Sequence, residues 1–259
     1  MNQTSHKEYY YLLDALRGLA LINMLLFHFC YDLFVIFGSN YSWYRQTPIH
    51  VWQQYICISF LMISGISWHF CRNNLKRGIQ LNLYGLLITA VTLVFLPDQT
   101  IWFGILNCIG CCTLLLIPFH RVNRHRPFTL KQRTAHGILG FFCSLFLFLI
   151  TRNITDGYLS FGFLNVRLPD ILYTIRPLTI LGFPHDGFSS GDYFPVLPWF
   201  FLFLCGYQLW EIIDNFPFLR RLLTFKVPVL SVIGRKTIWI YLLHQPVLYA
   251  LAYLCHHLF

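Results

Sequence analysis

The apolar run Tyr11–Phe37 constrains the fold of this chain more than any other stretch, because it contains four ionisable residues. The run is long enough to cross a bilayer as one helix. Its ionisable residues are Asp14, Arg17, His28 and Asp32. Each such group near the centre of a spanning helix costs roughly 2.5–3.5 kcal/mol on insertion scales. These four side chains are therefore expected to face protein or water, where that cost is reduced.

The spacing of these residues predicts a polar stripe along one face of the helix. At about 100° per residue, Asp32 lies five full turns beyond Asp14, and Arg17 and His28 fall within about 60° of the same line. Two simpler interpretations stay open. Asp14 and Arg17 could pair with each other among the lipid headgroups, and His28 could make an ordinary hydrogen bond between helices.

Composition indicates a membrane protein, with membrane lipids as its surroundings. Of 259 residues, 56% are hydrophobic and only 11% are charged, which is atypical of a soluble domain. The net charge of +9 would usually suggest nucleic acid as a partner. However, the basic residues lie in short loops between apolar runs, as the positive-inside rule expects. We therefore expect no nucleic-acid partner.

The apolar runs predict an all-α membrane helix bundle that forms a single domain over residues 1–259. Spanning helices are expected at 11–37, 51–70, 79–96, 101–119, 136–151, 193–213 and 236–257, and the fifth is short for a span. The piece Ile171–Gly182 is too short to cross and is interrupted by Arg176-Pro177, which predicts a re-entrant or interfacial segment.

The distribution of Lys and Arg predicts the orientation of the helices. With the amino terminus inside, 13 of the 19 Lys and Arg residues lie in the cytoplasmic segments 71–78, 120–133 and 214–236. Cysteine gives little further information. Cys108-x-x-Cys111-Cys112 is a weak metal motif without a second ligand pair, so we expect buried packing and no metal.

Several stretches resemble one group of membrane enzymes. LDALRGLALINMLLFH, in which His28 stands eleven positions after Arg17, resembles the first-helix motif of the integral-membrane acyltransferases. With Asp32 four positions after His28, the motif resembles that of the bacterial branch named after the catalytic domain of heparan-alpha-glucosaminide N-acetyltransferase. IGRKTIWIYLLHQP, residues 233–246, is similar to the carboxyl-terminal signature of the wider acyltransferase family 3 group.

Two further stretches resemble the same family. FGILNCIG, residues 103–110, is similar to its Gly-Ile-Leu-His-x-x-Gly helix, but Asn107 stands where that pattern has His. An Asn side chain can donate a hydrogen bond, but it cannot act as an acid or a base. GFSSGDYFPVLPW, residues 187–199, resembles the Asp-Tyr-Phe-Pro-x-x-Pro-Trp start of a late helix.

The resemblance implies transfer of an acyl group, with acetyl expected, from cytoplasmic acyl-CoA as co-substrate. The acceptor would be a hydroxyl or an amine of a carbohydrate or lipid-linked sugar at the outer side of a bacterial cytoplasmic membrane. An oligomer stays open. His is the natural base near neutral pH, and Asp32, one turn beyond His28, could take a proton or fix the tautomer of its ring.

The expected site residues form three groups. The catalytic group is His28, Asp32 and Arg17. The acceptor-binding group is Asn107, Asp192, Trp199, Arg176, His244 and Tyr241. The group that binds the acyl-CoA donor is Arg77, Lys76, Arg235 and Thr237, in which the cations would contact phosphates.

Alternatives to this assignment remain. Lys76 and Arg77 could serve only the positive-inside rule, Asp192 could be a helix cap, and His244 could be a satisfied core histidine. The same ionisable residues and broken segment would also suit a transporter for a small polar or anionic solute. A non-catalytic scaffold, fastened by its polar stripe, is a third possibility.

Overall fold

The computed structural model describes residues 8–38, 40–124 and 129–258. The chain divides into two compact units, of which the first comprises Met1–Ile63 and Phe216–Phe259 and the second Ser64–Asn215. The single domain expected from sequence stays a prediction. Within the described residues, seven helices are long and apolar enough to cross a membrane, which confirms the all-α polytopic fold class.

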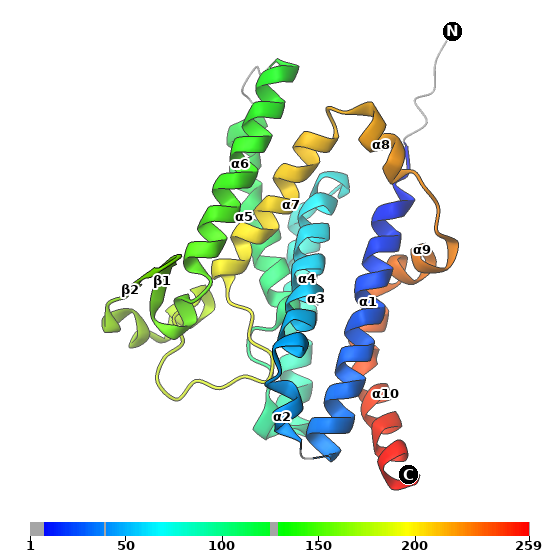
Figure 1. Ribbon diagram of the computed structural model, residues 1–259, viewed down its shortest axis with the longest axis vertical. Coiled ribbons are helices and arrows are strands. Elements are labelled where there is room, and N and C mark those ends of the chain that lie inside the picture. The colour runs from blue at the N-terminus through cyan, green and yellow to red at the C-terminus, as the bar shows by residue number, and fades with distance from the viewer. Residues whose placement is uncertain (1–7, 39, 125–128, 259) are drawn as a thin grey trace. The chain divides into compact units, whose positions relative to one another are not determined.

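The first unit is built around α1 (Tyr11–Tyr31), which continues as a π-helical segment, η1 (Asp32–Phe37). π-Helical turns are rare and often mark functional sites. The other elements are α2 (Tyr41–Tyr44), most of α3 (Thr47–Ser67), α8 (Pro217–Leu223), α9 (Pro228–Arg235) and α10 (Thr237–Leu258). Figure 1 shows α9 and then α10 beside α1.

Helices α1 and α10 run in the same direction. The Ser231 hydroxyl, in α9, donates to the Tyr11 carbonyl oxygen at the start of α1. At the other end, the rings of Phe37 and Tyr249 lie 5.0 Å apart. A parallel arrangement is what the first and the last of seven successive spans would have.

The close approach of α1 and α9 depends on two glycines. A Cβ on Gly18 would overlap the carbonyl oxygen of Leu230, and a Cβ on Gly234 would overlap that of Asp14. The backbones therefore touch at this crossing. Its consequence is that α9 is held directly against the helix that carries the polar stripe.

Burial along α1 agrees with the predicted stripe. Asp32 is 0% exposed and Asp14 is 8% exposed, whereas Leu16 and Leu26 on the opposite face are 42% and 51% exposed. The polar line therefore faces protein, and the apolar line is left for lipid.

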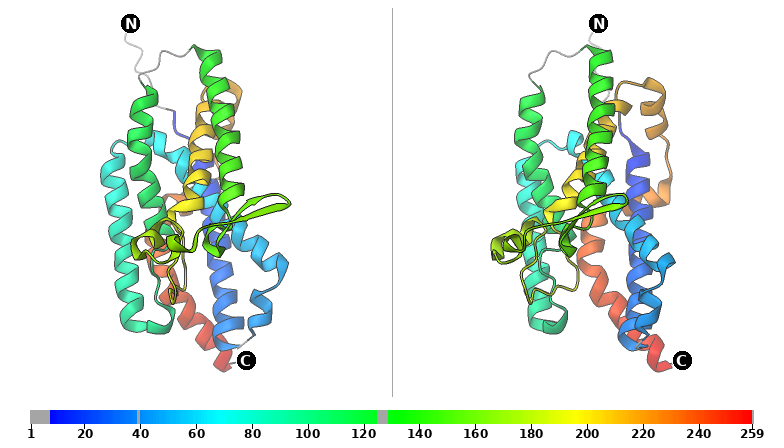
Figure 2. Two further views of the ribbon diagram at one scale, coloured as in Figure 1. Left: turned by 90° about the vertical axis from the view of Figure 1, so that its left-hand side faces the viewer. Right: turned by 60° about the vertical axis from the view of Figure 1, so that its left-hand side comes forward.

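The second unit contains the remaining elements. They are η2 (Trp68–Phe70), α4 (Asn74–Phe95), η3 (Pro97–Gln99), α5 (Ile105–Arg124), α6 (Leu130–Thr151), η4 (Ile154–Asp156), β1 (Tyr158–Phe161), β2 (Leu164–Arg167), η5 (Asp170–Tyr173), η6 (Arg176–Leu181) and α7 (Val196–Ile213). Helix α4 packs on α5, and α6 packs on α7. Figure 2 shows the β1–β2 hairpin projecting beside the end of α6.

Two helix starts differ from the sequence prediction because of capping side chains. The Asn73 side chain accepts from the Lys76 backbone N–H at 2.8 Å, so α4 begins at Asn74 and not at residue 79. Thr129 and Gln132 form a capping box that starts α6 at Leu130. The fifth span therefore has 22 residues, and the expectation that it is short was wrong.

Other elements were not predicted at all. The antiparallel hairpin pairs Tyr158 with Arg167 and Phe161 with Leu164, and Gly162 adopts a left-handed φ of 73° in its turn. Helices α8 and α9 each begin at a proline within the predicted loop 214–234. The apolar piece Ile171–Gly182 forms η5 and η6, too short to cross, and its re-entrant or interfacial position stays a prediction.

Candidate functional site

The first unit brings together two histidines that the sequence placed on separate helices. The ring centroids of His28 on α1 and His244 on α10 lie 5.0 Å apart. The Tyr241 ring lies 5.2 Å from that of His244. Three of the predicted site residues therefore meet where the parallel helices face each other.

Hydrogen bonding fixes the tautomer of neutral His244. Its Nδ1 lies within hydrogen-bond distance of the Tyr241 carbonyl oxygen, which can only accept, so Nδ1 carries the proton. The lone pair is then on Nε2, which is buried and has no hydrogen-bond partner among the described residues. An unpartnered buried acceptor costs about 1–3 kcal/mol. This nitrogen is consequently available to a bound molecule.

Asp32 is held by a residue that sequence reasoning missed. The Gln245 amide nitrogen donates to both carboxylate oxygens of Asp32, at 3.0 and 3.4 Å. The other end of the amide, Oε1, is buried without a partner. The expectation that Asp32 orients the His28 ring is therefore not matched by a hydrogen bond among the described residues. The only sequence signal for the role of Gln245 is its position directly after His244.

Arg17 pairs with Asp14, which is the simpler of the two arrangements predicted for it. Its guanidinium donates to an oxygen of Asp14 at 2.7 Å, and the Tyr9 hydroxyl donates to the other oxygen at 2.6 Å. Burial is the first cause that raises the pKa of Tyr9, followed by this hydrogen bond and the charge of Asp14. This cluster lies a few turns before the histidine pair, so a catalytic role for Arg17 stays a prediction.

The predicted donor-binding residues are divided between the two units. Arg235 is the exposed last residue of α9, and the Thr237 hydroxyl donates to the Gly234 carbonyl oxygen at 2.7 Å where α10 begins. Lys76 and Arg77 lie in the first turn of α4, and Arg77 reaches the Ser67 carbonyl oxygen at 3.4 Å. Their binding roles are not tested by these contacts.

Asn107 lies in the second unit, between α5 and α4. It is 5% exposed, and its amide nitrogen reaches the backbone oxygen of Asn82 at 3.3 Å. A Cβ on Gly85 would overlap the Asn107 side chain, which shows how closely the two helices pack there. In this position Asn107 joins two helices, and its predicted contact with the acceptor stays a prediction.

Two of the motif stretches meet in the second unit. The Gly191 and Phe194 backbone N–H groups donate to the carbonyl oxygens of Thr100 and Phe103, at 3.1 and 2.9 Å. The Ser190 hydroxyl accepts from the Trp102 N–H at 2.9 Å and donates to its carbonyl oxygen. These bonds fix the segment before α7 against the segment before α5.

Asp192 lies within this joined region, beside Gly104. It does not cap α7, because the N-cap is Pro195, so that alternative was wrong. Its half-buried carboxylate accepts no hydrogen bond from the described residues. Burial raises the pKa of Asp192 to about 7. The carboxyl can therefore exchange a proton or accept a hydrogen bond near neutral pH.

The other two predicted acceptor-binding residues are placed differently. The Trp199 ring, on α7, lies 5.2 Å from that of Phe194 and 5.7 Å from that of Phe148. Arg176 begins η6 and is exposed. Trp199 therefore packs on Phe194, which follows Asp192 by two residues, while no hydrogen bond or ion pair links Arg176 to Asp192 among the described residues.

A second polar cluster in the second unit was not predicted. The His69 ring stacks on Tyr207 at 4.2 Å, and the Tyr207 hydroxyl is 2.6 Å from His120 Nδ1. Glu211 lies 3.8 Å from His69 and 3.9 Å from Arg133. These residues come from η2, α5, α6 and α7, and a scattered set of this kind leaves no local pattern in the sequence.

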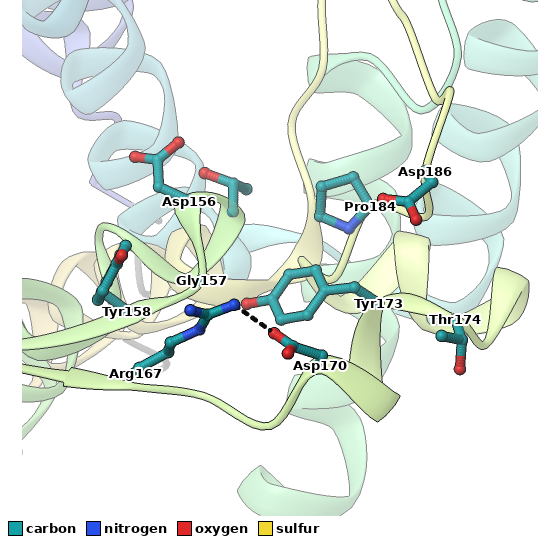
Figure 3. Close-up of a pocket in the computed structure, with 10 residues that line it drawn as sticks. Asp156, Gly157, Tyr158, Arg167, Asp170, Tyr173, Thr174, Pro184 and Asp186 are labelled. Atoms are coloured by element: carbon teal, nitrogen blue, oxygen red, sulfur yellow. Dashed lines mark hydrogen bonds and ion pairs between the residues drawn. The ribbon is translucent and has the colours of Figure 1, made fainter.

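The segment after α6 forms an open pocket of about 470 Å³. Tyr173 stands at its centre, and Arg167 pairs with Asp170 at 3.0 Å on one side (Figure 3). The pocket is lined by Thr155, Asp156, Gly157, Tyr158, Arg167, Asp170, Tyr173, Thr174, Pro184 and Asp186. None of these was a predicted site residue.

The cysteines form no metal site in the part of the chain that the structure describes. Cys108 and Cys112 lie 4.0 Å apart, sulfur to sulfur, on one face of α5, and Cys111 donates to Asn82. No group of three or more His, Cys, Asp or Glu among the described residues could hold a metal ion.

Seven apolar helices and an ionisable site inside two of them define an integral membrane protein with polar chemistry within its spans. Residues 10–246 match the family model described as heparan-alpha-glucosaminide N-acetyltransferase, catalytic. The chain belongs to this family, and it is therefore a membrane protein of the acetyltransferase type. No curated protein and no solved structure gave a match.

Proposed function

We propose that this protein transfers an acetyl group from cytoplasmic acetyl-CoA to a hydroxyl or amine of a glycan or lipid-linked sugar at the outer side of a bacterial cytoplasmic membrane. The observation that carries the proposal is the pairing of His28 and His244 between α1 and α10, inside the helices of an acetyltransferase family. No observation favours the transporter or the scaffold over this function.

The chemistry needs a base at the acceptor. The oxygen or nitrogen of the acceptor attacks the thioester carbonyl carbon, the carbon–sulfur bond breaks, and the sulfur leaves as thiolate. His28 takes the proton that the acceptor loses and returns it to the sulfur. Near neutral pH an imidazole is suited to both steps. His244 Nε2, which carries a lone pair and lacks a partner, would hold the acceptor by accepting its hydrogen bond.

The other proposed binding residues are divided between the cytoplasmic side, which binds the donor, and the outer side, which binds the acceptor. Arg77, Lys76 and Arg235 would contact the phosphates of the donor at the cytoplasmic side, where the basic segments are expected. Asp192 would accept a hydrogen bond from the acceptor at the outer side, which its unpartnered carboxylate supports. Asn107, Trp199, Arg176, Tyr241 and Thr237 complete the proposed binding groups.

The test is acetyl transfer by the purified full chain in lipid nanodiscs. Acetyl-CoA labelled in the acetyl group is supplied with a panel of amino sugars, neutral sugars and lipid-linked sugars. We expect labelled product from the wild type, and His28→Ala should lower kcat by roughly 10²–10⁴-fold. His50→Ala, at an exposed histidine of α3, is the matched control and should keep kcat.

The outcomes separate the possibilities. If the wild type neither transfers nor hydrolyses acetyl from acetyl-CoA with any acceptor, the proposed function is wrong. If His28→Ala keeps turnover and His244→Ala loses it, the function stands and the base belongs to α10. Solute exchange across the membrane of proteoliposomes that contain the purified chain, without chemistry on acetyl-CoA, would identify a transporter.

A further inference from the structure

The Gln245 side chain lies beside the histidine pair, and only one of its two polar atoms has a hydrogen-bond partner among the described residues. Its amide nitrogen donates to Asp32, and its oxygen is buried with no partner among the described residues. An ionised carboxylate can only accept, so the nitrogen must face Asp32 and the oxygen must face away. Asp32 is fully buried, so water does not compete for its oxygens. The carboxylate consequently fixes which end of the amide is presented to the site.

A second unpartnered acceptor stands next to it in sequence. His244 Nε2 is also buried and without a partner, because the proton of its ring is on Nδ1, toward the Tyr241 carbonyl. His244 contacts His28 on α1, and Gln245 contacts Asp32 at the start of η1, one turn further along the chain. Buried polar atoms of folded proteins nearly always have partners. Two neighbouring acceptors without one therefore indicate a place for a molecule that brings N–H or O–H groups.

We propose that Gln245 binds an N–H or O–H group of a substrate through its side-chain oxygen, and that Asp32 is the residue that positions Gln245 for this. The proposal rests on the proposed function and assigns Asp32 to act through Gln245, while His28 works without it. Two substrates offer such donors. The acceptor has hydroxyl or amine groups, and the arm of acetyl-CoA next to its sulfur has amide N–H groups.

The experiment replaces the pair without leaving a buried charge alone. In Asp32→Leu/Gln245→Leu both polar groups are removed, and apolar replacement of a buried polar pair often preserves stability. In Asp32→Asn/Gln245→Glu the hydrogen bond is kept with the amide on η1, and an oxygen acceptor stays on α10. KM and kcat are measured for both substrates with the full chain in nanodiscs. Gln54→Leu, a partly exposed glutamine of α3, is the control.

We expect the double leucine variant to raise the KM of one substrate about tenfold, the value of one ordinary hydrogen bond. The Asn/Glu variant should return that KM to within about threefold of the wild type. A rise in the KM of the sugar assigns the bound group to the acceptor, and a rise in the KM of acetyl-CoA assigns it to the donor. A purely structural hydrogen bond would move thermal stability and leave both KM values unchanged.

Unchanged KM values for both substrates in a folded double leucine variant would overturn the proposal. Such a result would mean that no substrate group bonds to the Gln245 oxygen. If the double leucine variant does not fold, Gln245→Asn provides the test, because it keeps an amide and withdraws its oxygen by one methylene. An unchanged KM there overturns the proposal equally. Failure of the proposed function is recognised separately, because the wild type itself would then transfer no acetyl group.

Discussion

The imidazole rings of His28 and His244 lie 5.0 Å apart with their planes inclined by 59°. The first ring comes from the first span and the second from the last, more than two hundred residues further along the chain. Such a pair can divide acid–base work from binding, because a neutral ring has one donor and one acceptor nitrogen.

Arg77→Ala should weaken the use of acetyl-CoA more than it slows turnover. If the guanidinium contacts a phosphate, its loss removes ground-state binding, and the KM for acetyl-CoA should rise about tenfold or more with a smaller change in kcat. Steady-state kinetics measures both. Arg72→Ala, at an exposed arginine two residues before α4, is the control. Equal effects of the two variants would assign both residues to orientation in the membrane.

Gly18→Ala should destabilise the first unit by about 1–3 kcal/mol, the usual cost of overpacking. The added Cβ would overlap the Leu230 carbonyl oxygen, so α9 would have to move away from α1. Thermal unfolding in a fixed detergent measures the loss. Leu19→Ala, on the exposed face of the same helix, should change stability much less. A Gly18→Ala protein as stable as the wild type would contradict the backbone contact.

Asp192→Asn should make stability less dependent on pH between about 4 and 7. The pKa of Asp192 is raised to about 7 by burial, so the folded protein binds more protons than the unfolded chain in this window. Stability of the wild type should therefore fall as pH rises through it. At pH 8 we expect Asp192→Asn to be more stable by about 1–2 kcal/mol, less than the full shift implies because the side chain is partly exposed. Asp98→Asn, at an exposed carboxylate, should leave the pH dependence of the melting temperature unchanged.

The segment 120–133, which covers the end of α5 and the start of α6, should be cytoplasmic. In a background without native cysteines, Arg121→Cys should resist an impermeant thiol reagent applied from outside, because its segment holds five of the Lys and Arg residues. Asp98→Cys, in η3 between α4 and α5, should be labelled from outside. Both positions are exposed, so access by the reagent depends on the side of the membrane. The reverse labelling pattern would invert the proposed orientation.

Sequence reasoning placed the spans well because a bilayer-length apolar run is a local property. It also identified the buried face of α1, since helix periodicity applies within one segment. It did not predict that His244 meets His28, because that contact depends on how two distant helices pack. Gln245 was missed for a related reason: a polar residue beside a motif is noticed only when its partner is known. The caps at Asn73 and Thr129 were local signals and could have been used.

The glycine crossing of α1 and α9 has a consequence for insertions and deletions in α1. Gly18 precedes His28 by ten residues, and Gly234 precedes His244 by the same ten. Since the glycines touch across α1 and α9 and the histidines meet between α1 and α10, both ends of this α1 segment are fixed by contacts. Inserting or deleting one residue in α1 between Gly18 and His28 would turn the His28 ring by about 100°. A substitution in this stretch keeps that register, whereas an insertion or a deletion would turn His28 away from His244.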